Sequence, residues 1–339
     1  MIRATMTQPG VIEFDETPVP VPGRDEVLLR VRRIGVCGSD IHVYHGRHPY
    51  TSYPVVQGHE FSAEVVEDAG DLAAGTLVTA PPQITCGACA CCRGGRYHIC
   101  ENLKVMGFQA PGVARQYVAL RRSEVIPLPA GFTPELGALV EPLAVAVHAV
   151  RRAGEVAGKQ VLVLGAGPIG NLVAQAARWR GAAKVAITDI SAWRLEVALQ
   201  CGLQHCHAAR SATLERDLGV ELGGSGADVV FECAGVEETA NQAIRLARKG
   251  STIVVVAVFG DRPAIDLGLV QDRELTLTGT LMYQRGDYLD AIRALSEGGV
   301  AAGPLVTASF PFRQYPEAYR YIDRNRDRVM KVMIDLDAG

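Results

Sequence analysis

Four regularly spaced cysteines are the residues of this chain best suited to binding a metal ion. The segment 86–100 contains five cysteines, and four of them fit the pattern Cys-x2-Cys-x2-Cys-x7-Cys: Cys86, Cys89, Cys92 and Cys100. This spacing lets one loop place four thiolates around a tetrahedral Zn²⁺ ion, filling its coordination shell and leaving no position for a substrate. The pattern therefore predicts a structural zinc site, with a knot of disulfides as the alternative.

The N-terminal sequence favours zinc over disulfides. Residues 1–6 (MIRATM) lead directly into a polar stretch and lack the apolar segment of a secretory signal. We therefore expect a cytoplasmic protein in a reducing environment. Clustered cysteines in such an environment are metal ligands more often than disulfides.

A second set of potential metal ligands is dispersed along the chain. Cys37, the adjacent His59 and Glu60, and Glu141 together offer a thiolate, an imidazole and carboxylates. This set suits a catalytic zinc with one open coordination position. Each residue also has an ordinary explanation, since single cysteines and histidines are usually core or satisfied polar residues. Glu141 lies between apolar stretches, where a cation would offset the cost of burial; the alternative is a first-turn acid interacting with a helix dipole.

A glycine-rich turn indicates a dinucleotide site. The segment Gly165-Ala-Gly167-Pro168-Ile169-Gly170 follows a buried-strand run and opens a predicted helix, which is the context that the GxGxxG fingerprint requires. The first glycine allows the tight turn, the second lets the backbone approach the pyrophosphate, and the third lets helix and strand pack closely. The helix N-terminus offers N–H donors and a partial positive charge to the phosphates.

An acidic residue supports the same interpretation. Asp189 ends the next predicted strand, about twenty residues further on, where a carboxylate accepts the ribose hydroxyls and repels a 2′-phosphate. We therefore expect NAD in preference to NADP. Arg194 has two interpretations of equal weight, a side chain lying along the adenosine or a surface charge on a helix.

Length and composition limit the possible functions. A chain of 339 residues is expected to form about two domains, and 48% hydrophobic residues fit a folded α/β protein. A net charge of −3 argues against binding to nucleic acid or to a membrane surface. The best apolar run, 161–172, is interrupted by glycines and a proline and is too short to span a membrane. The expected partner is a small-molecule substrate.

The pattern of predicted elements changes along the chain. The first 80 residues favour short strands, at 27–34 and 62–67, separated by turns rich in proline and glycine. From about residue 155, strands and helices alternate in the rhythm of a doubly wound parallel sheet. The strand expected at 329–334 is predicted to return to the first domain, which would make that domain discontinuous.

These motifs, taken in order, resemble those of the zinc-dependent medium-chain dehydrogenases. The resemblance covers essentially the whole chain and rests on Cys37, Gly58-His59-Glu60, the four-cysteine loop, Glu141-Pro142 and the glycine turn. Within that family, the chain most resembles the sorbitol, L-threonine 3- and L-galactonate 5-dehydrogenases. The resemblance implies an α/β protein with a GroES-like β-rich catalytic domain (residues 1–150 and 285–339) and a Rossmann NAD-binding domain (151–284).

The resemblance also implies roles for individual residues. Cys37 and His59 would bind the catalytic zinc, completed by Glu141 or Glu60. Three further roles follow: Asp40 would accept a hydrogen bond from the far nitrogen of His59, and Ser39 and His42 would relay a proton to solvent. The alternative for His42 is a solvated loop histidine.

The expected activity is the oxidation of a secondary alcohol on a sugar acid, such as L-galactonate or L-gulonate, or on a polyol. It would require two zinc ions per chain and NAD. An L-threonine 3-dehydrogenase is the alternative enzyme, and a non-catalytic NAD-binding protein is the alternative from another class. A homodimer or homotetramer is the expected assembly.

Overall fold

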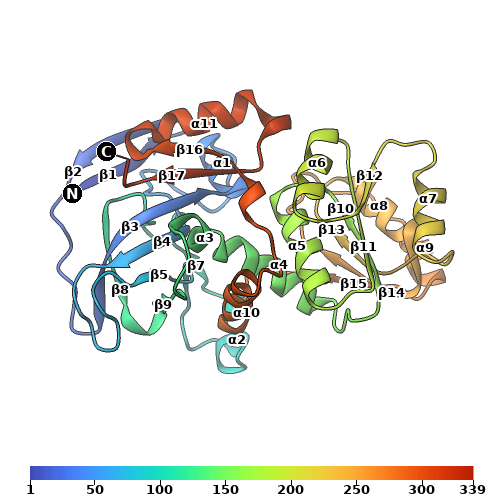
Figure 1. Ribbon diagram of the computed structural model, residues 1–339, viewed down its shortest axis with the longest axis horizontal. Coiled ribbons are helices and arrows are strands. Elements are labelled where there is room, and N and C mark those ends of the chain that lie inside the picture. Colours follow the sequence, from blue (N-terminus) through green and yellow to red (C-terminus); the bar gives the residue numbers. More distant parts are fainter. Residues whose placement is uncertain (339) are drawn as a thin grey trace. The chain divides into compact units, whose positions relative to one another are not determined.

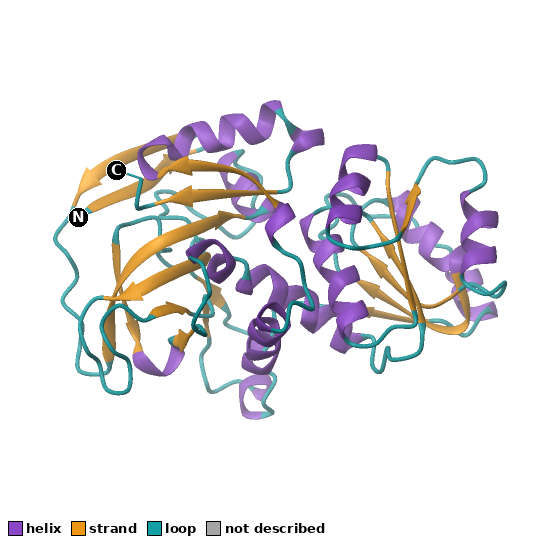
Figure 2. Ribbon diagram, in the orientation of Figure 1, coloured by secondary structure: helices purple, strands orange, loops and turns teal. Residues whose placement is uncertain are grey.

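The computed structural model describes residues 1–338, which divide into two compact units (Figure 1). The first unit comprises Met1–Glu141 and the segment from Val306 onward, and the second comprises Pro142–Leu305. Figure 2 shows that loops join most strands of the first unit, whereas strands alternate with helices in the second. The predicted α/β class, a β-rich domain plus a doubly wound one, is confirmed.

The first unit is built on a seven-stranded sheet in the order β16-β17-β3-β4-β5-β9, with β8 also paired to β3. The strands of the whole first unit, those outside this sheet included, are β1 (Ile2–Gln8), β2 (Val11–Glu16), β3 (Glu26–Val36), β4 (Glu60–Val65), β5 (Leu77–Thr79), β6 (Gln83–Ile84), β7 (Lys104–Val105), β8 (Tyr117–Arg121), β9 (Ile126–Pro127), β16 (Val306–Pro311) and β17 (Lys331–Asp335). Its helices are α1 (Gly38–Tyr44), α2 (Ala90–Arg93), α3 (Pro134–Ala138) and α11 (Tyr315–Arg324), and α4 (Val140–Arg152) begins in it.

The C-terminal strand β17 packs into the core of the first unit beside β3. Strand β3 alternates buried and more exposed residues along much of its length, because successive side chains of a strand point to opposite faces. Leu29 and Ile34 from this strand are fully buried together with Phe61 of β4. Strand β17 pairs antiparallel with β3, placing Ile334 opposite Ile34. The predicted return of the C-terminal strand is therefore confirmed.

The second unit contains a six-stranded, fully parallel sheet in the order β12-β11-β10-β13-β14-β15. Its strands are β10 (Gln160–Leu164), β11 (Lys184–Asp189), β12 (His205–Ala208), β13 (Ala227–Glu232), β14 (Ala247–Val255) and β15 (Thr276–Gly279). Its helices are α5 (Pro168–Trp179), α6 (Ala192–Gln200), α7 (Leu214–Glu221), α8 (Glu237–Leu246), α9 (Leu267–Asp272) and α10 (Arg285–Ser296).

The strand order places a switch point beside β10. From β10 the chain proceeds outward through β11 and β12, then crosses back to β13 on the other side of β10. A core made by the sheet with α7, α8 and α9 covers one face, and α5 and α6 lie on the opposite face (Figure 1). In such sheets, ligands bind at the carboxyl ends of the strands that flank the switch point.

The packing of helix α4 differs from the domain boundaries expected from the sequence. His148 of α4 lies 2.8 Å from Asp287 of α10, measured from Nδ1 to Oδ2, and Arg151 pairs with the same carboxylate at 3.0 Å. Arg152 of α4 also donates to the carbonyl oxygen of Gly279, in β15, at 3.0 Å. Residues 142–150 and 285–305 belong to the second unit, with the parallel sheet. The sequence-based boundaries had placed both segments in the other domain.

Within the described chain, no helix combines the length and apolar character needed to cross a membrane.

Candidate zinc centres and dinucleotide site

The four cysteines predicted to bind zinc come together in one loop. Their sulfur atoms all lie within 4.8 Å of one another. The Sγ–Sγ distances are 3.5 Å for Cys86–Cys100, 3.9 Å for Cys89–Cys100 and 4.0 Å for Cys86–Cys92. A tetrahedral shell with Zn–S bonds of about 2.3 Å separates its sulfurs by about 3.8 Å. The four thiols therefore have the spacing of a closed zinc site, and Cys91 is not one of the group.

The electrostatics of this loop also fit a cation. The N–H groups of Ala88 and Cys89 donate to Cys86 Sγ at 3.4 and 3.3 Å, and they lower the pKa of Cys86 to about 6. The pKa of Cys92 is instead raised to about 12, because desolvation and the neighbouring thiols oppose another negative charge. Four thiolates in one shell thus need a positive charge between them, which Zn²⁺ supplies.

A second cluster contains Cys37, His59 and Glu60, whose ligand atoms also lie within 4.8 Å of one another. Cys37 follows β3 and is the N-cap of α1, while Glu60 begins β4 directly after His59. Strands β3 and β4 pair antiparallel with Gly35 opposite Glu60, so the end of one strand meets the start of the other. The cluster combines the thiolate, imidazole and carboxylate donors that suit a catalytic zinc.

A buried lysine that the sequence analysis did not single out lies beside this cluster. Lys331 Nζ donates to both carboxylate oxygens of Glu60, at 2.7 and 2.8 Å, and the two residues are 3% and 1% exposed. Burial opposes protonation of Lys331, but the charges of Glu60 and Cys37 raise its pKa above the ordinary value. Glu60 is therefore held by a cation of the protein itself.

The geometry of Glu60 also depends on a glycine. A Cβ atom at Gly35 would lie 2.3 Å from Glu60 Oε2. Only glycine at this position of β3 leaves the carboxylate room to turn toward Lys331.

Asp40 faces His59, but the distance between them is longer than that of the predicted hydrogen bond. The distance from His59 Nδ1 to Asp40 Oδ1 is 3.6 Å, which is an electrostatic contact and not a hydrogen bond. Asp40 instead accepts the N–H of Cys37 at 3.0 Å, as the third residue of a capping box on α1, and the amide of Gln57 at 3.3 Å. Burial opposes protonation of His59, but Asp40 and Cys37 raise its pKa well above the ordinary value.

The remaining residues predicted for this site are placed on two helices. Ser39 and His42 belong to α1; the first is half-buried and the second is exposed. Glu141 is buried in the first turn of α4, and its charge contributes to the raised pKa of Lys331. It is not among the three residues that form the compact cluster.

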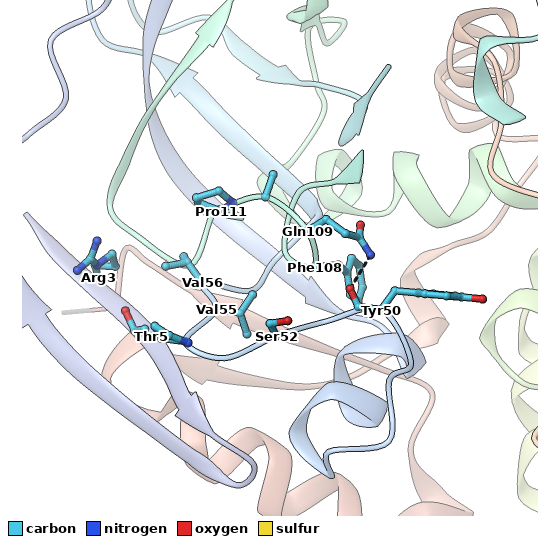
Figure 3. A pocket seen from close by; sticks show the side chains of 11 residues that line it. Arg3, Thr5, Tyr50, Ser52, Val55, Val56, Phe108, Gln109 and Pro111 are labelled. Carbon is cyan, nitrogen blue, oxygen red and sulfur yellow. Dashed lines mark hydrogen bonds between the residues drawn. The ribbon is translucent and has the colours of Figure 1, made fainter. Parts of the chain in front are cut away.

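An aromatic side chain connects the cluster to a cavity of about 510 Å³ in the first unit (Figure 3). The ring of Phe108 packs on His59 with centroids 5.0 Å apart and stacks on His48 at 4.8 Å. Phe108 also lines the cavity, near Tyr50. The amide of Gln109 donates to the Tyr50 carbonyl at 3.1 Å and so ties the two cavity-lining loops together.

The glycine turn in the second unit has the predicted geometry. Gly165 has φ +101°, and a Cβ atom at Gly170 would lie 1.8 Å from the Gly165 carbonyl oxygen, so both positions require glycine. Gly167 is the N-cap of α5, and the space around its Cβ position is open. Pro168 and Ile169 then begin the helix, and Pro168 has no N–H group to leave unpaired at that position. The N-terminus of such a helix offers the remaining N–H donors to an anion.

Asp189 is buried at the end of β11, and its carboxylate braces the turn. Oδ2 accepts the N–H of Ala166 at 2.7 Å, and Oδ1 accepts that of Ser191 at 2.8 Å. Arg194 lies in the first turn of α6, where its N–H is bound by the Ser191 hydroxyl at 3.3 Å. The structure therefore brings the predicted acidic residue directly to the glycine turn.

The chain matches two protein families and individual relatives along most of its length. The family described as "Alcohol dehydrogenase GroES-like domain" matches residues 23–130, and the family "Zinc-binding dehydrogenase" matches residues 168–297. The chain is 33% identical over 331 residues to L-galactonate-5-dehydrogenase of Escherichia coli (strain K12), covering 96% of each chain. It is 32% identical over 320 residues to L-threonine 3-dehydrogenase of Legionella pneumophila (strain Corby), covering 92% of this chain and 93% of that relative.

A solved structure agrees at the level of the fold. A zinc-binding dehydrogenase of Sinorhizobium meliloti 1021, bound to NADP, is similar with a TM-score of 0.89. The two sequences are 30% identical, and the similarity covers 98% of both chains.

The buried pair predicts a large loss of stability when one partner is removed. Lys331→Met leaves Glu60 without its cation, and such changes cost about 3–5 kcal/mol. Urea unfolding of the variant should show this loss. The double variant Glu60→Gln/Lys331→Met should recover most of it, because neither charge is then left unpaired. Equal stability of Lys331→Met and the wild type would contradict the role of the pair.

The two clusters predict different responses to cysteine replacement. Cys89→Ser opens the closed shell, so we expect loss of one zinc and a lower melting temperature, with activity falling only as the protein unfolds or dissociates. Cys37→Ser should remove the other zinc and abolish turnover while the fold remains. Metal analysis by mass spectrometry, with circular dichroism as the control, distinguishes the two. A single zinc per chain that survives Cys37→Ser would contradict the assignment of the second cluster.

Proposed function

The chain belongs to the zinc-dependent medium-chain dehydrogenases, and on that premise we propose that it oxidises a secondary alcohol on a small polyhydroxylated substrate to the ketone, using zinc and NAD. A sugar acid such as L-galactonate or L-gulonate, or a polyol, is the proposed substrate class. The observation that carries the proposal is the compact cluster of Cys37, His59 and Glu60 beside a paired cation. The similarity to an L-galactonate-5-dehydrogenase supports the substrate class.

The proposed zinc ligands are a cysteine, a histidine and a glutamate. Cys37 and His59 are the proposed protein ligands, and their positions at the ends of paired strands fix them before metal arrives. The carboxylate ligand is Glu141 or Glu60; the pairing of Glu60 with Lys331 favours Glu141. Zinc bound there would lower the pKa of a substrate hydroxyl, and the dinucleotide would accept the hydride.

The proton released from the substrate needs a path to solvent, and α1 offers one. The half-buried Ser39 and the exposed His42 lie on the same short helix, directly after Cys37. We assign Ser39 the first transfer and His42 the last, because an imidazole exchanges protons with water near neutral pH. Asp40 acts as a positioning residue, since it holds the start of α1 and faces His59.

The proposed cofactor is NAD in preference to NADP. The support is Asp189, whose carboxylate stands beside the glycine turn, where it would repel a 2′-phosphate. Arg194 is the proposed neighbour of the adenosine. A similar structure bound to NADP makes both cofactors part of the test.

Two other functions are weighed against this one. An L-threonine 3-dehydrogenase is the second candidate, supported by the similarity to the Legionella pneumophila enzyme. A non-catalytic NAD-binding protein is disfavoured, because a thiolate, an imidazole and a carboxylate lie together in one compact cluster.

The substrate class can be tested with a panel. The zinc-loaded enzyme should reduce NAD, followed at 340 nm, with L-galactonate, L-gulonate or a polyol such as sorbitol, and use L-threonine poorly. Parallel assays with NADP should give lower kcat/KM. Exclusive use of L-threonine would replace the first candidate by the second, and no turnover with any member of the panel would contradict the proposed class.

The proposed assembly is a cytoplasmic homodimer or homotetramer. The nine cysteines form no disulfide among residues 1–338, which is what the proposed reducing compartment predicts. Strand β15 is at the edge of the parallel sheet, and Leu277 on it and Leu281 just after it are 40% and 56% exposed. An exposed edge strand with apolar side chains is a template for pairing with a second chain.

Charges on this edge should therefore disrupt the assembly. The variant Leu277→Lys/Leu281→Lys is expected to elute as a monomer in size-exclusion chromatography with light scattering. Leu199→Lys, at an exposed leucine of α6, is the control and should leave the mass unchanged. An unaltered oligomer in the double variant would exclude this edge as the interface.

A further inference from the structure

A glutamate at the switch point of the parallel sheet is fully buried. Glu232 is the last residue of β13 and is 0% exposed. It lies opposite Leu164, the residue that precedes the glycine turn. Asp189 flanks this turn from β11, so Glu232 is its counterpart on the other side of β10.

The two carboxylate oxygens of Glu232 have different surroundings. Oε1 accepts three hydrogen bonds: from the N–H groups of Ala234 and Gly235 at 3.0 and 2.9 Å, and from the Thr239 hydroxyl at 2.7 Å. Oε2 is buried and has no hydrogen-bond partner among residues 1–338. Buried polar atoms without partners are rare because each costs free energy, and they call for an explanation. The protein thus uses Glu232 through a single oxygen.

That oxygen shapes the loop 233–236, which we call the switch-point loop. The loop is packed against the glycine turn, because a Cβ atom at Gly165 would lie 3.1 Å from both the Ala234 nitrogen and the Cys233 carbonyl carbon. On its other side, a Cβ atom at Gly235 would lie 2.9 Å from the Val258 carbonyl oxygen. No larger residue fits at either contact without moving the loop.

The backbone of Glu232 ties in the next strand as well. Its carbonyl oxygen accepts the N–H groups of Val256 and Ala257, at 2.9 and 3.0 Å, directly after β14. Glu232 therefore contacts both the switch-point loop after β13 and the segment after β14. The switch-point loop in turn contacts the glycine turn that follows β10. These three segments form the edge at which a doubly wound sheet binds its ligand.

We propose that Glu232 is a positioning residue for the dinucleotide: through Oε1 it fixes the switch-point loop against the glycine turn. This inference rests on the proposed function, since it requires that the chain bind NAD. Glu232 does not touch the cofactor, because its side chain is buried beneath the loop it holds. Glu232 acts by setting the surface that the nicotinamide half of the cofactor meets, on the side of β10 away from Asp189.

Because only one carboxylate oxygen of Glu232 is bonded, glutamine and leucine at this position should have different effects. Glutamine keeps one carbonyl oxygen and can make all three bonds of Oε1, whereas leucine keeps the size and makes none. A negative charge near a diphosphate is repulsive, so the loss of charge alone should tighten binding. Weaker binding in the leucine variant would therefore report loop geometry and not electrostatics.

The experiment measures NADH affinity by fluorescence titration of the purified full-length enzyme. We expect Glu232→Leu to raise the Kd for NADH at least tenfold and Glu232→Gln to change it less than threefold. Asp228→Asn is the matched control, because Asp228 lies on the same strand at the opposite edge, where it accepts the Gln160 N–H at 2.8 Å. The control should lower the melting temperature without changing the Kd.

Each outcome separates this inference from the proposed function. If the wild type binds neither NADH nor NADPH, the proposed function fails. If the wild type binds and Glu232→Leu binds equally well, the positioning role is overturned. Equal weakening in the glutamine and leucine variants would also overturn it, because glutamine keeps the oxygen that is proposed to hold the loop. Equal weakening in Glu232→Leu and Asp228→Asn would reduce the result to general destabilisation and likewise overturn the proposal.

Discussion

The buried ion pair between Glu60 and Lys331 is the interaction on which the first unit depends. It joins strand β4 to the C-terminal strand β17, across β3, within a core where an isolated charge would be costly. The last segment of the chain must therefore fold back beside β3 for Glu60 to be paired. The same pair lies next to Cys37 and His59, so the strand pairing that closes the sheet also brings the candidate metal ligands together.

The two metal clusters differ because their surroundings differ. The cysteine loop takes all its donors from one short segment, and its backbone N–H groups stabilise the thiolates locally. Its shell is closed and needs little from the rest of the fold. The cluster at Cys37 takes its donors from the end of β3 and the start of β4. It includes a histidine whose pKa is raised by Asp40 and Cys37 against the effect of burial. Such a cluster exists only when the sheet is formed, and three donors would leave one position of a four-coordinate zinc open.

Local sequence signals predicted much of this structure. The cysteine spacing, the glycine turn and the alternation of strands and helices depend on neighbouring residues, and the structure has each of them. The role of Lys331 could not be predicted, because nothing near it in the sequence shows that its side chain lies beside Glu60. The bond expected between His59 and Asp40 is a 3.6 Å contact, since Asp40 also caps α1. Residues 142–150 and 285–305 group with the parallel sheet, through contacts such as that of Arg152 with Gly279, which lie far apart in sequence.

The dinucleotide edge shows why sequence motifs describe only half of such a site. The fingerprint explains the β10 side, where Asp189 reaches back to the turn through Ala166. On the other side, the structure uses the same device with Glu232, whose carboxylate holds the loop that packs on Gly165. Glycine restricts the backbone less than other residues do, so a turn with three glycines needs rigid neighbours on both flanks to present its N–H groups in one geometry. Two buried carboxylates bound to backbone N–H groups provide that rigidity without filling the space that the phosphates need.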